Sequence, residues 1–220
     1  MRFQAVIFDF DGVIVDTEVT FVRALHEFLE RMGLSHDPDE ALKYTGLPPV
    51  EIISQIRRNL SNSEKYSETE LMEGLQEMYT KVIGQAEVIP MKGFQKFYDR
   101  LKENGVKVAL GTSRDADNAE ELMKSAGLDL EFDVAVTHKD ITHPKPHPET
   151  FILAAEKLAE MGISENEILI LEDSFNGIQA GKASGIFVVG FKGSEVVQNT
   201  SHADIECNSY EEVERFFFGS

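Results

Sequence analysis

The chain has 220 residues, 42% of them hydrophobic, and its 21 basic and 39 acidic side chains give a formal net charge of −18. So acidic a chain, with no basic or aromatic cluster, is not expected to bind nucleic acid, and no apolar run is long enough to span a membrane. The single cysteine, Cys207, excludes an internal disulfide and a thiolate metal site. We therefore expect a cytoplasmic protein of one large or two small domains, without a signal peptide.

The N-terminal stretch, residues 3–16, combines a strand signal with acidic residues. Residues 5–8 (AVIF) form an apolar run that predicts a strand buried on both faces. Asp9 and Asp11 follow, and two unpaired carboxylates are too costly to bury inside a strand. We expect them at the carboxyl end of the strand, where parallel α/β sheets bind ligands. Gly12 permits a sharp turn there and brings backbone N–H groups close to an anion.

Residues from about 17 to 85 show helical periodicity and no strand pattern. Apolar side chains recur at spacings of three and four in three segments, and a shorter helix is expected over residues 39–44. The segments are marked by Phe21, Leu25, Phe28, Leu29 and Met32; by Val50, Ile53, Ile56 and Leu60; and by Leu71, Leu75, Met78, Tyr79 and Val82. We predict a helical cap over residues 16–88, inserted into a core domain of residues 1–15 and 89–220.

Strands and helices alternate after this insertion. Strands are predicted at residues 106–110, 132–136, 168–171 and 186–189, with a last strand–helix pair from residue 193 onward. Helices are predicted around residues 94–101, 119–126, 151–158, 177–183 and 210–217. The alternation predicts an α/β fold built on a doubly wound parallel sheet.

Polar side chains follow three further strands of this predicted sheet. They are Thr112 and Ser113, Lys145 in a proline-rich loop, and Glu172 and Asp173. Because the carboxyl ends of parallel strands lie along one edge, we expect these groups to meet the two aspartates of the first strand. Four strand ends with complementary polar groups indicate a functional site.

These motifs, in this order, resemble those of the haloacid dehalogenase-like hydrolases. The matching pieces are Asp9-Phe10-Asp11-Gly12, Gly111-Thr112-Ser113, Lys145-Pro146-His147-Pro148 and Glu172-Asp173-Ser174-Phe175-Asn176-Gly177-Ile178. The resemblance is to the subfamily with a helical cap after the first strand, which includes beta-phosphoglucomutase and phosphoglycolate phosphatase-like proteins. It implies a Rossmann-like core and a Mg²⁺-dependent phosphatase acting on a small phosphorylated metabolite, such as a sugar phosphate.

The resemblance also implies a role for each matching residue. Asp9 is the nucleophile that becomes an aspartyl-phosphate, and Asp11 is the general acid and base. A carboxylate and a phosphate repel each other, so a cation is needed, and Mg²⁺ prefers oxygen ligands. Asp9, the backbone carbonyl of Asp11, and Asp173 are expected to hold it, with Glu172 either a direct ligand or an acceptor for metal-bound water.

Four residues are expected to hold the transferring phosphoryl group. Thr112 would donate to a phosphate oxygen beside the N–H groups of Ser113 and Gly12, although Thr112 could instead be an ordinary helix N-cap. Lys145, in a loop stiffened by prolines, would supply a compact positive charge.

Three other classes of protein compete with the phosphatase interpretation. The related mutases usually carry a histidine and an arginine where this chain has Phe21 and Pro48-Pro49, so hydrolysis is favoured. Dehalogenases lack the second aspartate and need no metal, which Asp11 and Asp173 argue against. A phospho-acceptor signalling domain would be much shorter, would lack the cap, and would not place its acceptor on the first strand.

Several residues near these motifs have weaker signals. His143 and His147 flank Lys145, but prolines prevent a helix there, so we interpret them as loop residues near the site entrance rather than metal ligands. Arg114 is interpreted as an exposed surface arginine rather than one that faces the cap or substrate. Substrate selectivity is expected from cap residues, namely Thr17, Phe21, Gly46, Leu47 and Lys81.

Overall fold

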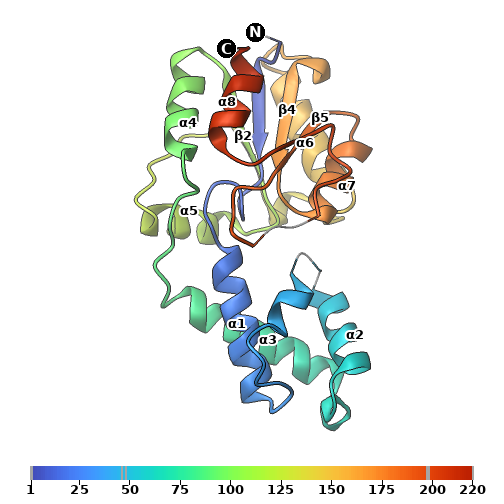
Figure 1. Ribbon diagram of the computed structural model, residues 1–220. Coiled ribbons are helices and arrows are strands. Elements are labelled where there is room, and N and C mark those ends of the chain that lie inside the picture. Colours follow the sequence, from blue (N-terminus) through green and yellow to red (C-terminus); the bar gives the residue numbers. More distant parts are fainter. Residues whose placement is uncertain (1, 46, 48, 197–198, 220) are drawn as a thin grey trace. The chain divides into compact units, whose positions relative to one another are not determined.

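The computed structural model describes residues 2–45, 47, 49–196 and 199–219. The backbone divides into two compact units (Figure 1). The helical unit is Thr17–Glu87, and the core unit is formed by the described residues on either side of it.

The sheet that the described residues form in the core unit has six strands, in the order β3-β2-β1-β4-β5-β6. Every neighbouring pair is parallel. The strands are β1 (Ala5–Phe8), β2 (Lys107–Gly111), β3 (Val134–Val136), β4 (Ile168–Glu172), β5 (Phe187–Phe191) and β6 (Ile205–Cys207). The predicted parallel α/β fold is confirmed, and the direction of strand order reverses between β1 and β4, which is where such sheets bind ligands.

Helices cover both faces of the sheet because residues of β1 alternate between them. Ile7 lies in an apolar cluster with α6 (Glu149–Ala159) and α7 (Phe175–Ala183). Phe8 points to the other face, where its ring centroid lies 5.6 Å from that of Phe94. That aromatic layer joins α4 (Phe94–Glu103) to α8 (Tyr210–Phe218), and Figure 1 shows helices on both sides of the strands. The remaining core helix is α5 (Ala116–Ser125).

The helical unit has its own apolar core, built by α1 (Glu18–Arg31), α2 (Pro49–Asn59) and α3 (Glu68–Ile83). A 3₁₀ turn at Ala41–Tyr44 takes the place of the short predicted helix. One expectation is wrong: Val50 is 72% exposed, whereas Ile52 is fully buried. A rotation of about 100° per residue places Val50 nearly opposite Ile52, so it leaves the stripe formed with Ile53 and Ile56.

The chain leaves and re-enters the core unit through two segments that pair with each other. Val15 and Pro90 form an antiparallel bridge. The Asp16 N–H donates to the Ile89 carbonyl at 3.0 Å, and the Met91 N–H donates to the Ile14 carbonyl at 2.9 Å. The two ends of the helical insertion are therefore held side by side.

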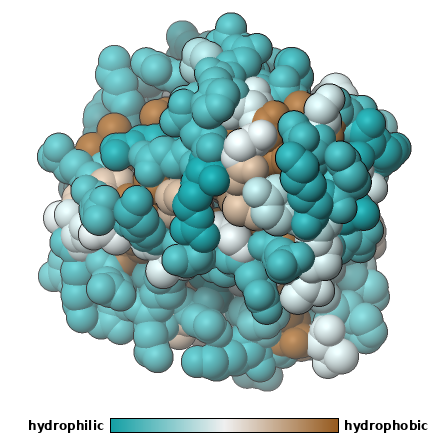
Figure 2. Space-filling view, turned by 90° about the horizontal axis from the view of Figure 1, so that it is seen from below, coloured by the Kyte–Doolittle hydropathy of each residue, from teal (hydrophilic) through white to brown (hydrophobic). Residues whose placement is uncertain are grey.

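One face of the surface shows how polar and apolar residues are distributed on it. The face drawn in Figure 2 is largely hydrophilic, and its hydrophobic colour occurs in small separated spots. Within the described ranges, no helix combines the length and apolar character needed to cross a bilayer.

Candidate active site

The carboxylates of the predicted site meet at the ends of β1 and β4. The two strands pair in register up to Phe8 opposite Leu171, and the Asp9 N–H donates to the Leu171 carbonyl at 2.9 Å. Asp9, Glu172 and Asp173 are all buried, and each offers an oxygen within 4.8 Å of the others. The reversal point of the sheet therefore holds three carboxylates that were predicted to converge there.

Lys145 reaches these carboxylates from the proline-rich loop. Its ammonium donates to Asp9 Oδ1 at 2.5 Å, to Glu172 Oε1 at 2.8 Å and to the Gly111 carbonyl at 3.1 Å. The side chain is only 6% exposed, and its ammonium lies 4.6 Å from the centre of the Phe151 ring. Burial alone would lower its pKa, but the charges of Asp9 and Glu172 raise the pKa above that of a free lysine. Lys145 is therefore a fixed cation.

Asp9 has a strongly perturbed acidity. Burial is the largest cause and raises the pKa of its carboxyl to about 7; the Lys145 charge lowers the pKa, while the charges of Glu172 and Asp11 raise it further. One lysine does not balance the negative charge gathered here. The surplus favours binding of a cation beside Asp9.

Two glycines allow the carboxylates to approach the backbone. Gly12 has a φ of +69°, and a Cβ there would lie 1.9 Å from Asp173 Oδ2. A Cβ on Gly177 would lie 1.5 Å from Glu172 Oε1. Gly12 therefore serves both the turn and the close packing of Asp173, and Gly177 makes room for Glu172.

The donor set fits a hard divalent cation such as Mg²⁺, which takes oxygen ligands and retains several waters. The two oxygens of Glu172 already have partners. Lys145 contacts Oε1, and the Ser174 N–H and hydroxyl donate to Oε2 at 2.8 and 3.0 Å. Asp9 and Asp173 are therefore better direct ligands, and Glu172 is better suited to orienting the lysine and a metal-bound water.

The predicted phosphate-binding residues follow β2, the strand beside β1. Thr112 is buried, and its hydroxyl accepts the Arg114 N–H at 3.1 Å. The N-cap of α5 is Asp115, so Thr112 is not the helix cap considered as its alternative role. Ser113 is exposed at the same strand end.

Arg114 corrects one expectation, because it is not a free surface arginine. Its Nε donates to Asp11 Oδ2 at 2.8 Å and its Nη2 donates to Asp11 Oδ1 at 2.6 Å. The side chain is 13% exposed, and Nη1 also donates to Asn118 Oδ1. Arg114 therefore binds both carboxylate oxygens of Asp11, the predicted general acid and base. Its position directly after Thr112-Ser113, at the end of a strand, was the feature of the sequence that could have indicated a place in the site.

The expected selectivity residues lie within the helical unit. Phe21 packs edge-on against Tyr79, with ring centroids 5.8 Å apart, and contributes to the apolar core of that unit. Thr17 is buried, Leu47 packs against the same core, and Lys81 lies 4.0 Å from Glu27. Gly46 and Pro48, which also entered the predictions, lie outside the described residues.

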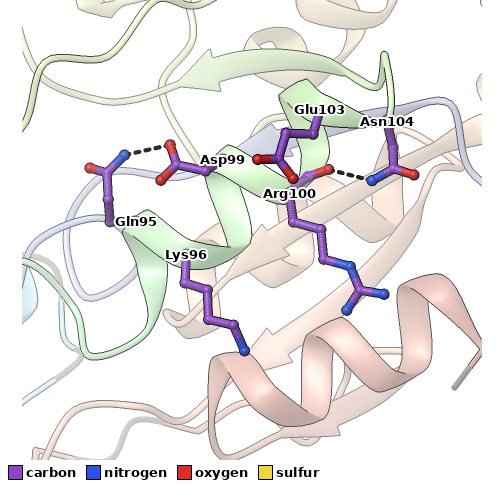
Figure 3. A pocket seen from close by; sticks show the side chains of 6 residues that line it. All are labelled: Gln95, Lys96, Asp99, Arg100, Glu103 and Asn104. Atoms are coloured by element: carbon purple, nitrogen blue, oxygen red, sulfur yellow. Dashed lines mark hydrogen bonds between the residues drawn. The ribbon is translucent and has the colours of Figure 1, made fainter.

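A separate hollow of about 620 Å³ lies along α4. It is lined by Gln95, Lys96, Asp99, Arg100, Glu103 and Asn104 (Figure 3). Gln95 donates to Asp99 at 2.8 Å, and Asn104 donates to the Arg100 carbonyl at 2.8 Å. The Lys96 and Arg100 side chains pair with Glu214 of α8. None of the residues that line this hollow belongs to the predicted catalytic set.

Comparisons with known proteins agree with this geometry. A family model described as "Haloacid dehalogenase-like hydrolase" matches residues 6–191. Fructose-1-phosphate phosphatase of Escherichia coli is 30% identical over 86% of this chain and 96% of its own length. A phosphorylated carbohydrates phosphatase of Thermotoga maritima is 29% identical over 83% of this chain and 82% of its own. The beta-phosphoglucomutase structure from Clostridium difficile has a TM-score of 0.69 at 23% identity, covering 99% of this chain and 100% of that one.

Proposed function

We propose that this chain, which belongs to the haloacid dehalogenase-like hydrolase family, hydrolyses a small phosphorylated sugar or related metabolite through an aspartyl-phosphate on Asp9. Family membership and the named phosphatase relatives make the chain a phosphatase. The observation that carries the more specific proposal is the buried Lys145 ammonium, in contact with Asp9 and Glu172 at the reversal point of the sheet.

The substrate class rests on charge and on the relatives. The names of two relatives specify fructose 1-phosphate and phosphorylated carbohydrates. A chain with a net charge of −18 repels large polyanions, whereas one phosphate ester can meet the local positive charge of Lys145. A compact phosphomonoester therefore fits better than a nucleic acid.

Asp9, Asp173 and the backbone carbonyl of Asp11 would hold Mg²⁺. When bound, the ion neutralises charge, so that a carboxylate and a phosphate can approach each other. The role of Glu172 is to keep Lys145 in place and to accept a hydrogen bond from metal-bound water.

In the first step, a carboxylate oxygen of Asp9 attacks phosphorus, and the bond from phosphorus to the ester oxygen breaks. The proton that the leaving alkoxide needs comes from the Asp11 carboxyl. Lys145 stabilises the negative charge on the transferring group, assisted by the Thr112 hydroxyl and the N–H groups of Ser113 and Gly12. The products of this step are the free alcohol and phosphorylated Asp9.

In the second step, water attacks phosphorus of the aspartyl-phosphate, and Asp11 takes the proton that water loses. Inorganic phosphate leaves, and Asp9 is restored as a carboxylate. Arg114 donates to both oxygens of the Asp11 side chain, and these two hydrogen bonds hold that side chain in one orientation. Asp11 carries a proton into the first step and gives it to the leaving oxygen, so it is a carboxylate when water attacks in the second step.

The test is a panel of phosphorylated metabolites incubated with Mg²⁺ and scored for both released phosphate and isomerised product. We expect phosphate release that stops in chelator and returns with Mg²⁺. Asp9→Asn, nearly isosteric, should abolish turnover while leaving the thermal unfolding transition in place. Appreciable hydrolysis by Asp9→Asn would refute the nucleophilic role, and clean interconversion of two sugar-phosphate isomers by the wild type would replace hydrolysis with mutase activity.

A further inference from the structure

The loop that carries Lys145 also presents two histidines beside a glutamate. In the part of the chain that the structure describes, two groups of three candidate ligands have atoms within 4.8 Å of one another. One is the set of catalytic carboxylates. The other is His143, His147 and Glu149, which the proposed phosphatase chemistry does not use.

The spacing of the second group suits a small tetrahedral ion. Zn²⁺ binds imidazole nitrogen and carboxylate oxygen at about 2.0–2.1 Å, which places ligand atoms about 3.3 Å apart. His143 Nδ1 lies 2.9 Å from Glu149 Oε2, and His147 Nδ1 lies 3.9 Å from the same oxygen. The two imidazole ring centroids are 4.7 Å apart. The two nitrogen–oxygen distances lie on either side of the required value, and all three ligand atoms lie within 4.8 Å of one another.

The carboxylate of this group is held in position by the backbone. The Thr142 N–H donates to Glu149 Oε1 at 2.9 Å, and the His143 N–H donates to Oε2 at 2.8 Å. These two backbone hydrogen bonds lower the pKa of the Glu149 carboxyl and keep it ionised. Metal-ligating carboxylates are typically fixed by such outer contacts.

The histidines are positioned by a constrained loop and remain open to solvent. Pro144 and Pro148 restrict the backbone on either side, and the His147 N–H donates to the Pro144 carbonyl at 3.0 Å. The His143 and His147 side chains are 64% and 51% exposed, so water can occupy the remaining coordination position. The His147 Nδ1 accepts the Glu149 N–H at 3.3 Å, a long hydrogen bond that a metal can replace.

We propose that His143, His147 and Glu149 form a second cation site, selective for borderline transition metals such as Zn²⁺ and separate from the all-oxygen magnesium site. Imidazole suits Zn²⁺, Ni²⁺ and Cu²⁺, whereas Mg²⁺ takes oxygen ligands. The ligands lie on both sides of Lys145 in the chain, so an ion bound there restrains the segment that delivers the ammonium to Asp9.

The experiment measures Zn²⁺ binding by competition with a chromophoric chelator, in excess Mg²⁺ to protect the carboxylate site. Wild type should bind one more Zn²⁺ than the double variant His143→Ala/His147→Ala. Each single variant and Glu149→Gln should weaken that site by about 10-fold or more. The matched control is His138→Ala, an exposed histidine of the same region outside the group, which should bind as wild type does.

Asp173→Asn separates the two sites. It should retain the histidine-dependent Zn²⁺. Zn²⁺ should raise the unfolding temperature of Asp173→Asn but not that of the triple variant Asp173→Asn/His143→Ala/His147→Ala. The proposal is overturned if the double variant binds Zn²⁺ as wild type does. It is equally overturned if Asp173→Asn abolishes all Zn²⁺ binding. Both readouts are independent of phosphatase turnover, so failure of the proposed function would leave them intact.

Discussion

Lys145 stands between two buried carboxylates, and its removal should have two distinguishable effects. We predict that Lys145→Met destabilises the protein by about 3–5 kcal/mol, because Asp9 and Glu172 would be left buried without their countercharge. Activity should fall as well, since the transferring group loses its fixed cation.

The double variant Lys145→Met/Glu172→Gln separates these effects. Removing one carboxylate charge should recover part of the stability, as measured by urea denaturation, but none of the turnover. If the single variant is as stable as wild type, the lysine does not compensate the buried charge. If the double variant regains wild-type turnover, the proposed role of Lys145 is wrong.

Individual site residues were predictable to different degrees. Asp9, Glu172 and Asp173 could be located because a charge directly after an apolar run must lie at a strand end. Arg114 was discounted although it directly follows Thr112-Ser113 at a strand end, because its pairing with Asp11 joins segments 103 residues apart and depends on the direction of its side chain. The histidine pair was discounted because no helix forms there, yet the loop itself brings both rings to Glu149.

Among the elements, β2 and β3 are joined by an acidic side chain as well as by their ladder. Asp133 accepts from Lys107 Nζ at 2.6 Å and from the Val108 N–H at 3.0 Å. Burial raises the pKa of its carboxyl, but the hydrogen bonds from Lys107 and Val108 outweigh burial and lower the pKa below its ordinary value of 3.8. The ionised form is thus stabilised by folding.

This lowered pKa predicts a pH-dependent contribution to stability. The contribution should be present above pH 3.8 and disappear as pH falls through the still lower pKa of the folded state. Asp133→Asn should therefore cost on the order of 1 kcal/mol at neutral pH and almost nothing in strong acid. Urea midpoints across this range, with exposed Asp129→Asn as the control, provide the measurement. A cost that is equal at both ends of the range would contradict the assignment.

The helices and strands were easier to predict than the residues at which they begin and end. Alternation of apolar strands and amphipathic helices identified the parallel sheet, but the strand expected over residues 132–136 is confined to Val134–Val136. Just before that strand, the Asp133 N–H donates to the Val108 carbonyl at 2.8 Å, and the Val108 N–H donates to the Asp133 carboxylate at 3.0 Å. Val50 was also assigned wrongly to the buried face, because an apolar residue in the first turn of a helix need not face the core.

At the scale of the whole molecule, each unit has its own apolar core, and the insertion begins and ends on paired segments. We predict that replacing Thr17–Glu87 with a short Gly-Ser linker leaves a folded core unit, because little loop closure is required at that point. A cooperative urea transition and well-dispersed amide signals, compared with the full chain, would support this. A broad, non-cooperative transition would show that the core unit needs the helical unit in order to fold.

The bridge between Val15 and Pro90 also makes this protein a host for grafting. Any foreign domain whose termini lie close together could be spliced between Asp16 and Val88 without straining the sheet beneath it. If the inserted domain becomes rigid when it binds its own ligand, the motion of residues 14–16, a few positions from Asp11, would be restricted as well. The rate of phosphate release would then report binding of the inserted domain's ligand, a molecule that this chain does not itself bind.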